Sequence, residues 1–364
     1  MRLKTILWTS LIPIIVVSGT FSAQADVSVA SWGGVYTKSQ QKAFGETWEK
    51  RAGKSVRWID YNGGLGEIRA QVNSGKVLWD VVDVFPDQAR VGCDEGLFET
   101  LPRDRFTAAP DGTPMDQDLV VPRPNDCVVP NVFWSWLVFF DETKFPDAKP
   151  RTIEDFFDLK KFPGKRSIGA FAQANIEMAL VADGVSPNDI YKVMDTKTGI
   201  DRAFAKLDTI KNDVLFWSSA GKPIDYVNEG AVVMATAYNG RVSDAIIVDG
   251  APLKIIWDGQ VLEEEWFVMV KGTENYDDAL DFLIHASATK QLAALAKWIT
   301  YGPLRRSSLA VIRANEPWHS TGVPIMPHMP NRAEVMKRTI IANPDWWAEN
   351  GARIGERYKN WMAR

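Results

Sequence analysis

The chain has 364 residues, of which 46% are hydrophobic and 24% are charged, and its formal net charge at pH 7 is −4. An acidic chain with a pI of 5.6 is not typical of a nucleic-acid-binding protein, so no nucleic-acid partner is expected. The length exceeds what one hydrophobic core usually organises, which favours a division into two lobes.

The first residues are typical of a secretory signal peptide. Arg2 and Lys4 precede an apolar stretch, and Ala23 and Ala25 then supply the small-x-small pattern that signal peptidase recognises. We therefore expect residues 1–25 to be a signal peptide and the mature protein to be soluble and exported. No later stretch approaches roughly 18 uninterrupted apolar residues, the length that a membrane helix needs.

Cys93 and Cys127 are the only cysteines of the chain. In an oxidising compartment a disulfide is the default interpretation, and two free buried thiols are the alternative. The bridge would close a loop of about 35 residues and contribute about 3–4 kcal/mol in the chain-entropy model.

Strands and helices alternate in the first part of the mature chain. Strands are predicted at 27–32, 55–61 and 79–85, and helices at 37–51, 66–75 and 87–96. This alternation indicates a mostly parallel sheet with helices on both faces. Ligands of such sheets bind beyond the carboxyl ends of the strands, which here carry Trp32, Tyr61 and Asp87.

A second alternation follows an apolar strand at 132–140. Helices are predicted at 152–159, 175–184, 199–212, 223–230, 277–298 and near 331–362, with strands at 213–221, 231–240 and 252–270. We expect two α/β lobes joined by extended crossings, with a cleft between them. Lobe 1 is assigned to 26–135 and 264–310, and lobe 2 to 136–263 and 311–364.

Tryptophan is unusually frequent, with 15 residues. Several of these residues stand at expected loops or element ends, namely Trp32, Trp134, Trp136, Trp346 and Trp347. Aromatic faces in such places suit cations and aliphatic stems. Ordinary packing is the alternative for any one of them.

Motifs for catalysis, metals and cofactors are weak. The stretch "NGGLGEIRA" has an arginine where a dinucleotide fingerprint needs its third glycine, and neither G-x-S-x-G nor H-E-x-x-H occurs. The three histidines and two cysteines form no pattern of metal ligands, so no metal and no cofactor are expected. One enzyme alternative is a glycoside hydrolase that uses the paired carboxylates Glu263 and Glu265.

Several stretches, in order along the mature chain, carry a family resemblance: "VASWGGVY", "WDVVDVFPDQ", "TIEDFFDLKKFPGKRSIGAF", "AVVMATAYNGR" and "DDALDFLIHASATKQLAALAKWITYGP". The chain resembles the periplasmic spermidine/putrescine-binding proteins of bacterial ABC importers and their relatives that bind amino-acid derivatives. The resemblance implies a two-lobed, type II-like binding protein with a hinge and a periplasmic location. It also implies a monomer whose partner is an inner-membrane permease with its ATPase.

The resemblance also implies which residues line the pocket. The tryptophan of the first strand falls on Trp32, the aromatic residue before Asn-Gly on Tyr238, and the tyrosine after the long helix on Tyr301. A carboxylate that holds an amine aligns with Glu265. The expected ligand-binding residues are Trp32, Tyr36, Asp87, Trp134, Phe171, Tyr238, Arg241, Glu263, Glu265, Tyr301 and Trp347.

The chain departs from the polyamine binders in ways that bear on the ligand. Their two carboxylates before the helix at 175–184 align with Phe171 and Ala174, and a pocket glutamine aligns with Trp347. Arg241 directly follows Asn-Gly, where its guanidinium fork suits a carboxylate.

We therefore expect a solute-binding protein for an amine-bearing zwitterion, a γ-amino acid such as γ-aminobutyrate (GABA) or an opine-type conjugate. A polyamine, held by Asp83, Asp87, Glu263 and Glu265, is the alternative ligand. Two interpretations without a ligand remain open: a salt bridge from Arg241 to Asp244, and a solvated acidic turn at 263–265.

Overall fold

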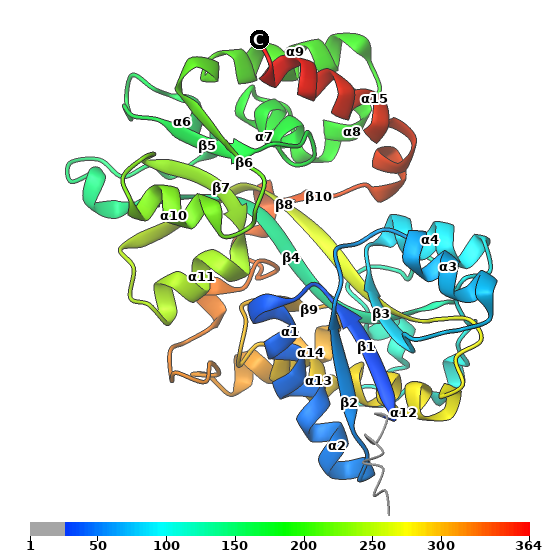
Figure 1. Cartoon of the computed structure of the whole chain (residues 1–364). Helices are drawn as coiled ribbons and strands as arrows, with labels where there is room; N and C mark the ends of the chain where they lie inside the picture. The colour runs from blue at the N-terminus through cyan, green and yellow to red at the C-terminus, as the bar shows by residue number, and fades with distance from the viewer. Residues whose placement is uncertain (1–25) are drawn as a thin grey trace, which may run out of the picture.

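The computed structural model describes residues 26–364, so the predicted signal peptide lies outside the described residues. Over this range one sheet runs through both halves of the molecule in the order β2-β1-β3-β8-β4-β7-β5-β6, with β10 on β8 and β9 on β4. Figure 1 shows helices packed around each half and the longest strands running between the halves. The two-lobed α/β fold is confirmed. From Asp26 onward, no helix combines the length and the apolar character needed to cross a bilayer.

The first lobe is built on three parallel strands, β1 (Val27–Ser31), β2 (Val56–Asp60) and β3 (Val81–Val84). Its core strands are buried on both faces; every residue of β1 and β3 is buried. The helices of this lobe are α1 (Gly34–Gln40), α2 (Glu46–Ala52), α3 (Gly66–Ser74), α4 (Pro86–Asp94), α5 (Met115–Asp118), α12 (Tyr276–Ala286), α13 (Thr289–Leu295) and α14 (Arg306–Ala314), with a π turn at Gln41–Gly45 joining α1 to α2.

The second lobe repeats the arrangement with the parallel strands β5 (Arg166–Gly169), β6 (Val214–Trp217) and β7 (Met234–Tyr238). Helix α7 is buried along its whole length, because it packs between the sheet and α9. The helices here are α6 (Ile153–Phe157), α7 (Asn175–Ala182), α8 (Ile190–Met194), α9 (Lys197–Asp208), α10 (Lys222–Asn228), α11 (Asn239–Ile247) and α15 (Pro344–Met362).

Two long antiparallel strands connect the lobes, β4 (Val128–Asp141) and β8 (Leu253–Met269). The sheet is therefore mixed in its centre, where the sequence predicted a mostly parallel arrangement. All of β4 except Asp141 is buried, since lobe elements cover both of its faces. Its register on β8 shifts twice, between Pro130 and Phe133 and between Trp136 and Val138, and such bulges bend and re-aim a strand.

A third, shorter crossing lies near the C-terminus. Strand β10 (Ile340–Ile341) pairs with β8, and β9 (Gly302–Pro303) pairs with β4. Ile312, Ile325 and Met329 pack with residues of α13 in one buried cluster, so the chain up to this point stays with the first lobe. We therefore propose that the last segment of lobe 2 begins near β10, beyond residue 311.

The predicted long helix at 277–298 is in fact two helices, α12 and α13. At the break, Ser287 Oγ donates to Leu283 O at 2.7 Å, and Ser287 O accepts from Arg305 Nη1 at 3.0 Å. The Ser287 side chain thus bonds to the carbonyl of the preceding turn, and the Ser287 carbonyl bonds to Arg305 instead of to a later backbone N–H. The run of helical backbone hydrogen bonds ends there. Ala288 is accordingly extended, with φ −68° and ψ 150°.

The predicted helix near 331–362 begins only at Pro344. Asn343 is its N-cap, and the Asn343 side chain accepts from Trp346 N at 3.0 Å, while the proline occupies the first turn. Both residue types favour a helix start at this point. Before it, the chain forms turns and a 3-10 turn at Met336–Arg338, and then pairs with β8 as the short strand β10.

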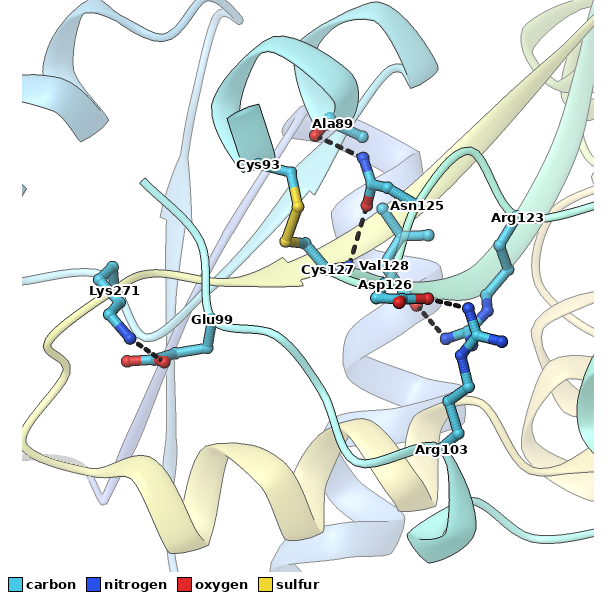
Figure 2. Close-up of a disulfide and its surroundings, with 10 residues drawn as sticks. All are labelled: Ala89, Cys93, Glu99, Arg103, Arg123, Asn125, Asp126, Cys127, Val128 and Lys271. Carbon is cyan, nitrogen blue, oxygen red and sulfur yellow. Dashed lines mark hydrogen bonds and ion pairs between the residues drawn. A yellow bond between two sulfur atoms is a disulfide. The ribbon is translucent and has the colours of Figure 1, made fainter. Parts of the chain in front are cut away.

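The expected disulfide between Cys93 and Cys127 is present (Figure 2). It joins α4 to the start of β4. The neighbouring Asn125 fixes this loop, since its Nδ2 donates to Ala89 O at 3.0 Å and its Oδ1 accepts from Cys127 N at 2.9 Å. The bridge thus anchors a helix of the first lobe to one of the strands that cross between lobes.

Candidate ligand-binding site

The carboxyl ends of the parallel strands of both lobes face a common cleft. Between them lies a cavity of about 370 Å³, which we call the aromatic chamber. It is lined by Trp32, Tyr36, Tyr61, Asn62, Phe85, Trp134, Phe171, Trp217, Ser218, Ala220, Tyr238, Arg241, Glu265 and Tyr301. Most of these residues follow directly on the strands, in agreement with the general position of ligand sites in α/β sheets.

Trp32 forms one wall of the aromatic chamber. Gly33 and Gly34, with φ of 71° and 60°, turn the chain sharply from β1 into α1, a conformation that a side chain at Cβ disfavours. The Trp32 ring stacks on Phe85 with centroids 4.6 Å apart and tilts against Tyr61 at 5.1 Å. The turn thus presents an indole with fixed orientation to the cleft.

Glu265 lies at the base of the aromatic chamber, on β8. Its Oε2 accepts from Trp134 Nε1 at 2.9 Å, its Oε1 accepts from Trp32 Nε1, and only 2% of the residue is exposed. Burial raises the pKa of the Glu265 carboxyl well above its usual value, and the charge of nearby Asp83 raises this pKa further. The carboxylate has neutral hydrogen-bond donors but no basic partner within 4.0 Å among residues 26–364.

Asp83 is buried behind this site and does not line the chamber. Its carboxyl accepts from Gln40 Nε2 at 2.6 Å, Ser31 Oγ at 2.7 Å and Asn131 Nδ2 at 2.6 Å. Burial raises the pKa of Asp83 to about 7. Asp83 was one of the residues expected to hold a polyamine, but its carboxyl already accepts hydrogen bonds from the protein and does not line the chamber.

The second lobe contributes Tyr238 and Arg241, at the start of α11. Tyr238 packs against Trp136 and Trp134, with ring centroids 4.2 and 5.3 Å apart. The Arg241 guanidinium reaches the first lobe: if Gly34 carried a Cβ atom, Arg241 Nη1 would lie 3.7 Å from it. Over the described range Arg241 has no hydrogen bond to the protein, and no carboxylate, Asp244 included, lies within 4.0 Å.

A second cavity of about 320 Å³ adjoins the first and shares Phe85 and Phe171 with it. We call it the acidic chamber. It is lined by Phe85, Pro86, Asp87, Ala170, Phe171, Ala172, Gln173, Leu262, Glu263, Glu264, Ala342, Pro344, Trp347, Gly351, Gly355 and Lys359. Phe85 and Phe171 thus stand where the two chambers meet.

The residues expected to bind ligand therefore divide between two chambers. Those in the aromatic chamber are Trp32, Tyr36, Trp134, Phe171, Tyr238, Arg241, Glu265 and Tyr301, and those in the acidic chamber are Asp87, Phe171, Glu263 and Trp347. The alternative of a solvated acidic turn is wrong, because Glu263 and Glu265 are 7% and 2% exposed.

Sequence reasoning did not select Asn62, Phe85, Trp217 and Ser218, which also line the aromatic chamber. Each stands at or just after the carboxyl end of a parallel strand. Phe85, Trp217 and Ser218 lie within the predicted strands and Asn62 is one residue beyond one, so the ends of those strands contain the signal that identifies them.

Comparison with known families adds a decisive observation. Residues 43–322 match the family described as bacterial extracellular solute-binding protein. The chain belongs to this family.

This solute-binding protein has relatives that match nearly its full length. It is 34% identical over 338 residues to the gamma-aminobutyric acid-binding protein of Pseudomonas aeruginosa, covering 93% of this chain and 91% of the relative. A solved structure described as a GABA receptor is 28% identical, with a TM-score of 0.76, over 93% of this chain and 98% of that chain. The binding protein MotA from A. tumefaciens B6, in complex with glucopine, is 27% identical, with a TM-score of 0.77, over 93% and 99%.

The predicted resemblance to solute-binding proteins, including relatives that bind amino-acid derivatives, is confirmed. These relatives are binding proteins, so this solute-binding protein is not an enzyme and the glycoside-hydrolase alternative is set aside. A cleft with aromatic walls and oriented charged groups suits capture of a small molecule without bond chemistry.

Proposed function

We propose that this protein captures a small zwitterion in the periplasm for an ABC importer. The ligand carries an amine and a separate carboxylate, as in GABA or an opine-type amino-acid conjugate. The observation that carries the proposal is the placement of Arg241 and Glu265 in the lining of one chamber, the first from the second lobe and the second from a crossing strand.

The charges of the aromatic chamber match such a ligand. Arg241 has no partner among the described side chains, and its planar fork pairs with a carboxylate through parallel hydrogen bonds. Glu265 offers an acceptor for an ammonium, and the rings of Trp32 and Tyr238 cover the aliphatic part of the ligand. Exclusion of water by these rings strengthens both charge contacts.

Closure of the cleft follows from contacts to both lobes. A ligand bound to Arg241 on one side and to Trp32 on the other stabilises the closed form by its better affinity for that form. The closed protein would then dock on an inner-membrane permease with its ATPase, the partners that the family implies.

A polyamine is the second candidate. Of its expected carboxylates, Asp87 and Glu263 line the acidic chamber, Glu265 lines the aromatic chamber and Asp83 lines neither. Arg241 opposes this candidate, because a polyamine lying in the aromatic chamber would place cations beside the unpaired guanidinium. Asp83, whose carboxyl already accepts hydrogen bonds from Ser31, Tyr36, Gln40 and Asn131, offers little to a ligand.

Calorimetric titration of the purified protein with GABA, an opine, putrescine and spermidine tests the proposal. Arg241→Ala should lower zwitterion affinity by about 2–4 kcal/mol, whereas polyamine affinity should hold or rise. Arg313→Ala is the matched control, because Arg313 is exposed on α14 outside both chambers. Undiminished zwitterion binding by Arg241→Ala would contradict the proposal.

A further inference from the structure

The acidic chamber extends the ligand cleft beyond the zwitterion site. It shares Phe85 and Phe171 with the aromatic chamber, so a ligand that extends past these rings enters both cavities. Carboxylates from two different elements line it, Asp87 from the first turn of α4 and Glu263 and Glu264 from β8.

One carboxyl oxygen of Glu263 has no hydrogen-bond partner among the described residues. Its Oε1 accepts from Trp136 Nε1 at 2.8 Å and from Gln173 Nε2 at 2.8 Å. Among residues 26–364 its Oε2 has no hydrogen-bond partner, although the residue is only 7% exposed and lines the chamber. Burial raises the pKa of Glu263 to about 8, so a bound cation would have a strong effect on its ionisation.

Trp347 gives the same chamber an aromatic wall whose orientation is fixed from behind. Its Nε1 donates to Glu177 Oε1 at 2.6 Å, and Tyr191 OH donates to the same oxygen at 3.1 Å. Glu177 itself is fully buried on α7. The hydrogen bond holds the indole edge against the protein and leaves the ring as part of the lining.

Helix α15 leaves space along this wall. Trp347, Gly351, Gly355 and Lys359 recur every fourth residue and all line the chamber. A Cβ at Gly355 would meet nothing within 4 Å, and one at Gly351 would meet only the Trp347 ring at 3.6 Å. Glycine inside a helix costs roughly 0.5–1 kcal/mol of stability relative to alanine. Since a larger residue would fit at both positions, packing within this chain does not explain why they are glycine.

Lys359 is the one basic residue in the lining, and it is exposed on the last turns of α15. The buried carboxylate of Glu263 and the face of Trp347 lie deeper, and an acid with an aromatic face is the combination that recognises organic cations. A polyol would find donors and acceptors here too, but it would bring no positive charge to the unpartnered Glu263 Oε2.

We propose that the acidic chamber is a subsite for a second cationic group of the ligand, an ammonium or guanidinium that contacts Glu263 Oε2 and the face of Trp347. The inference rests on the proposed function: the carboxylate and amine of the ligand occupy the aromatic chamber, and its chain passes Phe85 and Phe171. The ligand class is an amino acid that carries an additional cation at the far end of its chain.

The test uses matched pairs of ω-guanidino amino acids and their neutral urea isosteres, with chains of increasing length that start from arginine and citrulline. Affinities for the full-length mature protein are measured by calorimetry, with GABA as the reference. For at least one chain length the charged member should bind at least about tenfold tighter than its neutral isostere, the effect of one well-placed charge contact.

Two variants and a control locate the effect. Glu263→Gln keeps an acceptor for Trp136 and should remove most of the charged-to-neutral ratio. Gly355→Leu fills the chamber where no atom lies within 4 Å of the new Cβ, and should weaken the longer guanidino ligands much more than GABA. Glu349→Gln, exposed on the same helix, should leave the ratio unchanged.

The outcomes separate this inference from the proposed function. Equal binding of charged and neutral members at every length overturns the subsite, as does a ratio that survives Glu263→Gln. If GABA binds and depends on Arg241 in the same assays, the zwitterion site stands alone. If GABA, the opine and every member of the series fail to bind, both the proposed function and the subsite are wrong.

Discussion

Trp134 donates its indole N–H to Glu265 Oε2 at 2.9 Å, from one crossing strand to the other. This neutral donor orients the carboxyl of Glu265, a buried residue that lines the aromatic chamber. It does so without placing a positive charge beside the carboxyl, so the group stays available to a ligand amine. In the proposed function, the positive charge beside Glu265 comes from the ligand amine.

The first prediction concerns Glu265. Glu265→Gln keeps the size of the side chain and its oxygen acceptor but removes the charge, so the affinity for GABA should fall by about 2–4 kcal/mol. Calorimetry measures the loss, and Glu274→Gln is the control, since Glu274 is exposed away from both chambers. A Glu265→Gln protein that binds GABA as tightly as the parent would exclude Glu265 as the amine partner.

Part of this site could be predicted from strand ends read from hydrophobic patterns, and part from the family resemblance. Trp32 stands at the end of a predicted strand, the resemblance identifies Tyr238 and Tyr301, and all three line the aromatic chamber. Local pattern is sufficient where a residue's position follows from the element that it ends.

The contacts to Glu265 could not be predicted in the same way. Its indole donors, Trp134 and Trp32, are separated from it by 131 and 233 residues, and the register of β4 on β8 shifts between Pro130 and Phe133. A shift of one residue turns a side chain to the other face, so hydrophobicity alone does not determine which tryptophan meets which glutamate. The position of Phe85 and Phe171 where the two chambers meet likewise depends on tertiary packing.

The second prediction is a release of protons on binding. Burial raises the pKa of Glu265 well above its usual value. A ligand ammonium favours the charged carboxylate and lowers this pKa, so binding should release protons. Below the pKa of the empty site, affinity should therefore rise with pH, by up to about tenfold per pH unit.

Calorimetry in buffers of different ionisation enthalpy measures this proton count directly. The parent protein should release protons on binding GABA, and Glu265→Gln should release markedly fewer. Binding enthalpies that do not depend on the buffer would show that Glu265 is already ionised before the ligand arrives.

The third prediction concerns stability and Glu177, the buried residue behind Trp347. Burial raises the pKa of Glu177 to about 7 from an unfolded value of 4.5. The folded state thus binds the Glu177 proton more tightly than the unfolded state. The contribution of protonated Glu177 to the free energy of unfolding is therefore full below pH 4.5 and is lost as pH rises through 7. Glu177→Gln does not titrate, so its thermal midpoint should fall less than that of the parent between pH 5 and 8.

Thermal unfolding of both proteins at several pH values, without ligand, makes the comparison. The control is Glu349→Gln, whose midpoint should follow the parent, because Glu349 is exposed. Parallel curves for the parent and Glu177→Gln would mean that Glu177 is not protonated in the folded protein.

The fourth prediction concerns an ion pair across the cleft. Arg90 Nη1 of α4 lies 2.9 Å from Asp345 Oδ1 of α15, and these side chains are 44% and 51% exposed. An exposed pair contributes at most about 1 kcal/mol, but this one joins the lobes and exists only when they are close together. Arg90→Gln should therefore speed ligand dissociation and lower affinity by up to about fivefold.

A matched control exists within the first lobe. Arg69 Nη2 lies 2.7 Å from Glu95 Oε2, with side chains 42% and 39% exposed, and this pair does not span the cleft. Arg69→Gln should leave the dissociation rate unchanged in stopped-flow measurements of tryptophan fluorescence. High salt screens exposed pairs, so it should bring the parent rate close to that of Arg90→Gln. Equal dissociation rates of the parent and Arg90→Gln at low salt would mean that this ion pair does not stabilise the closed cleft.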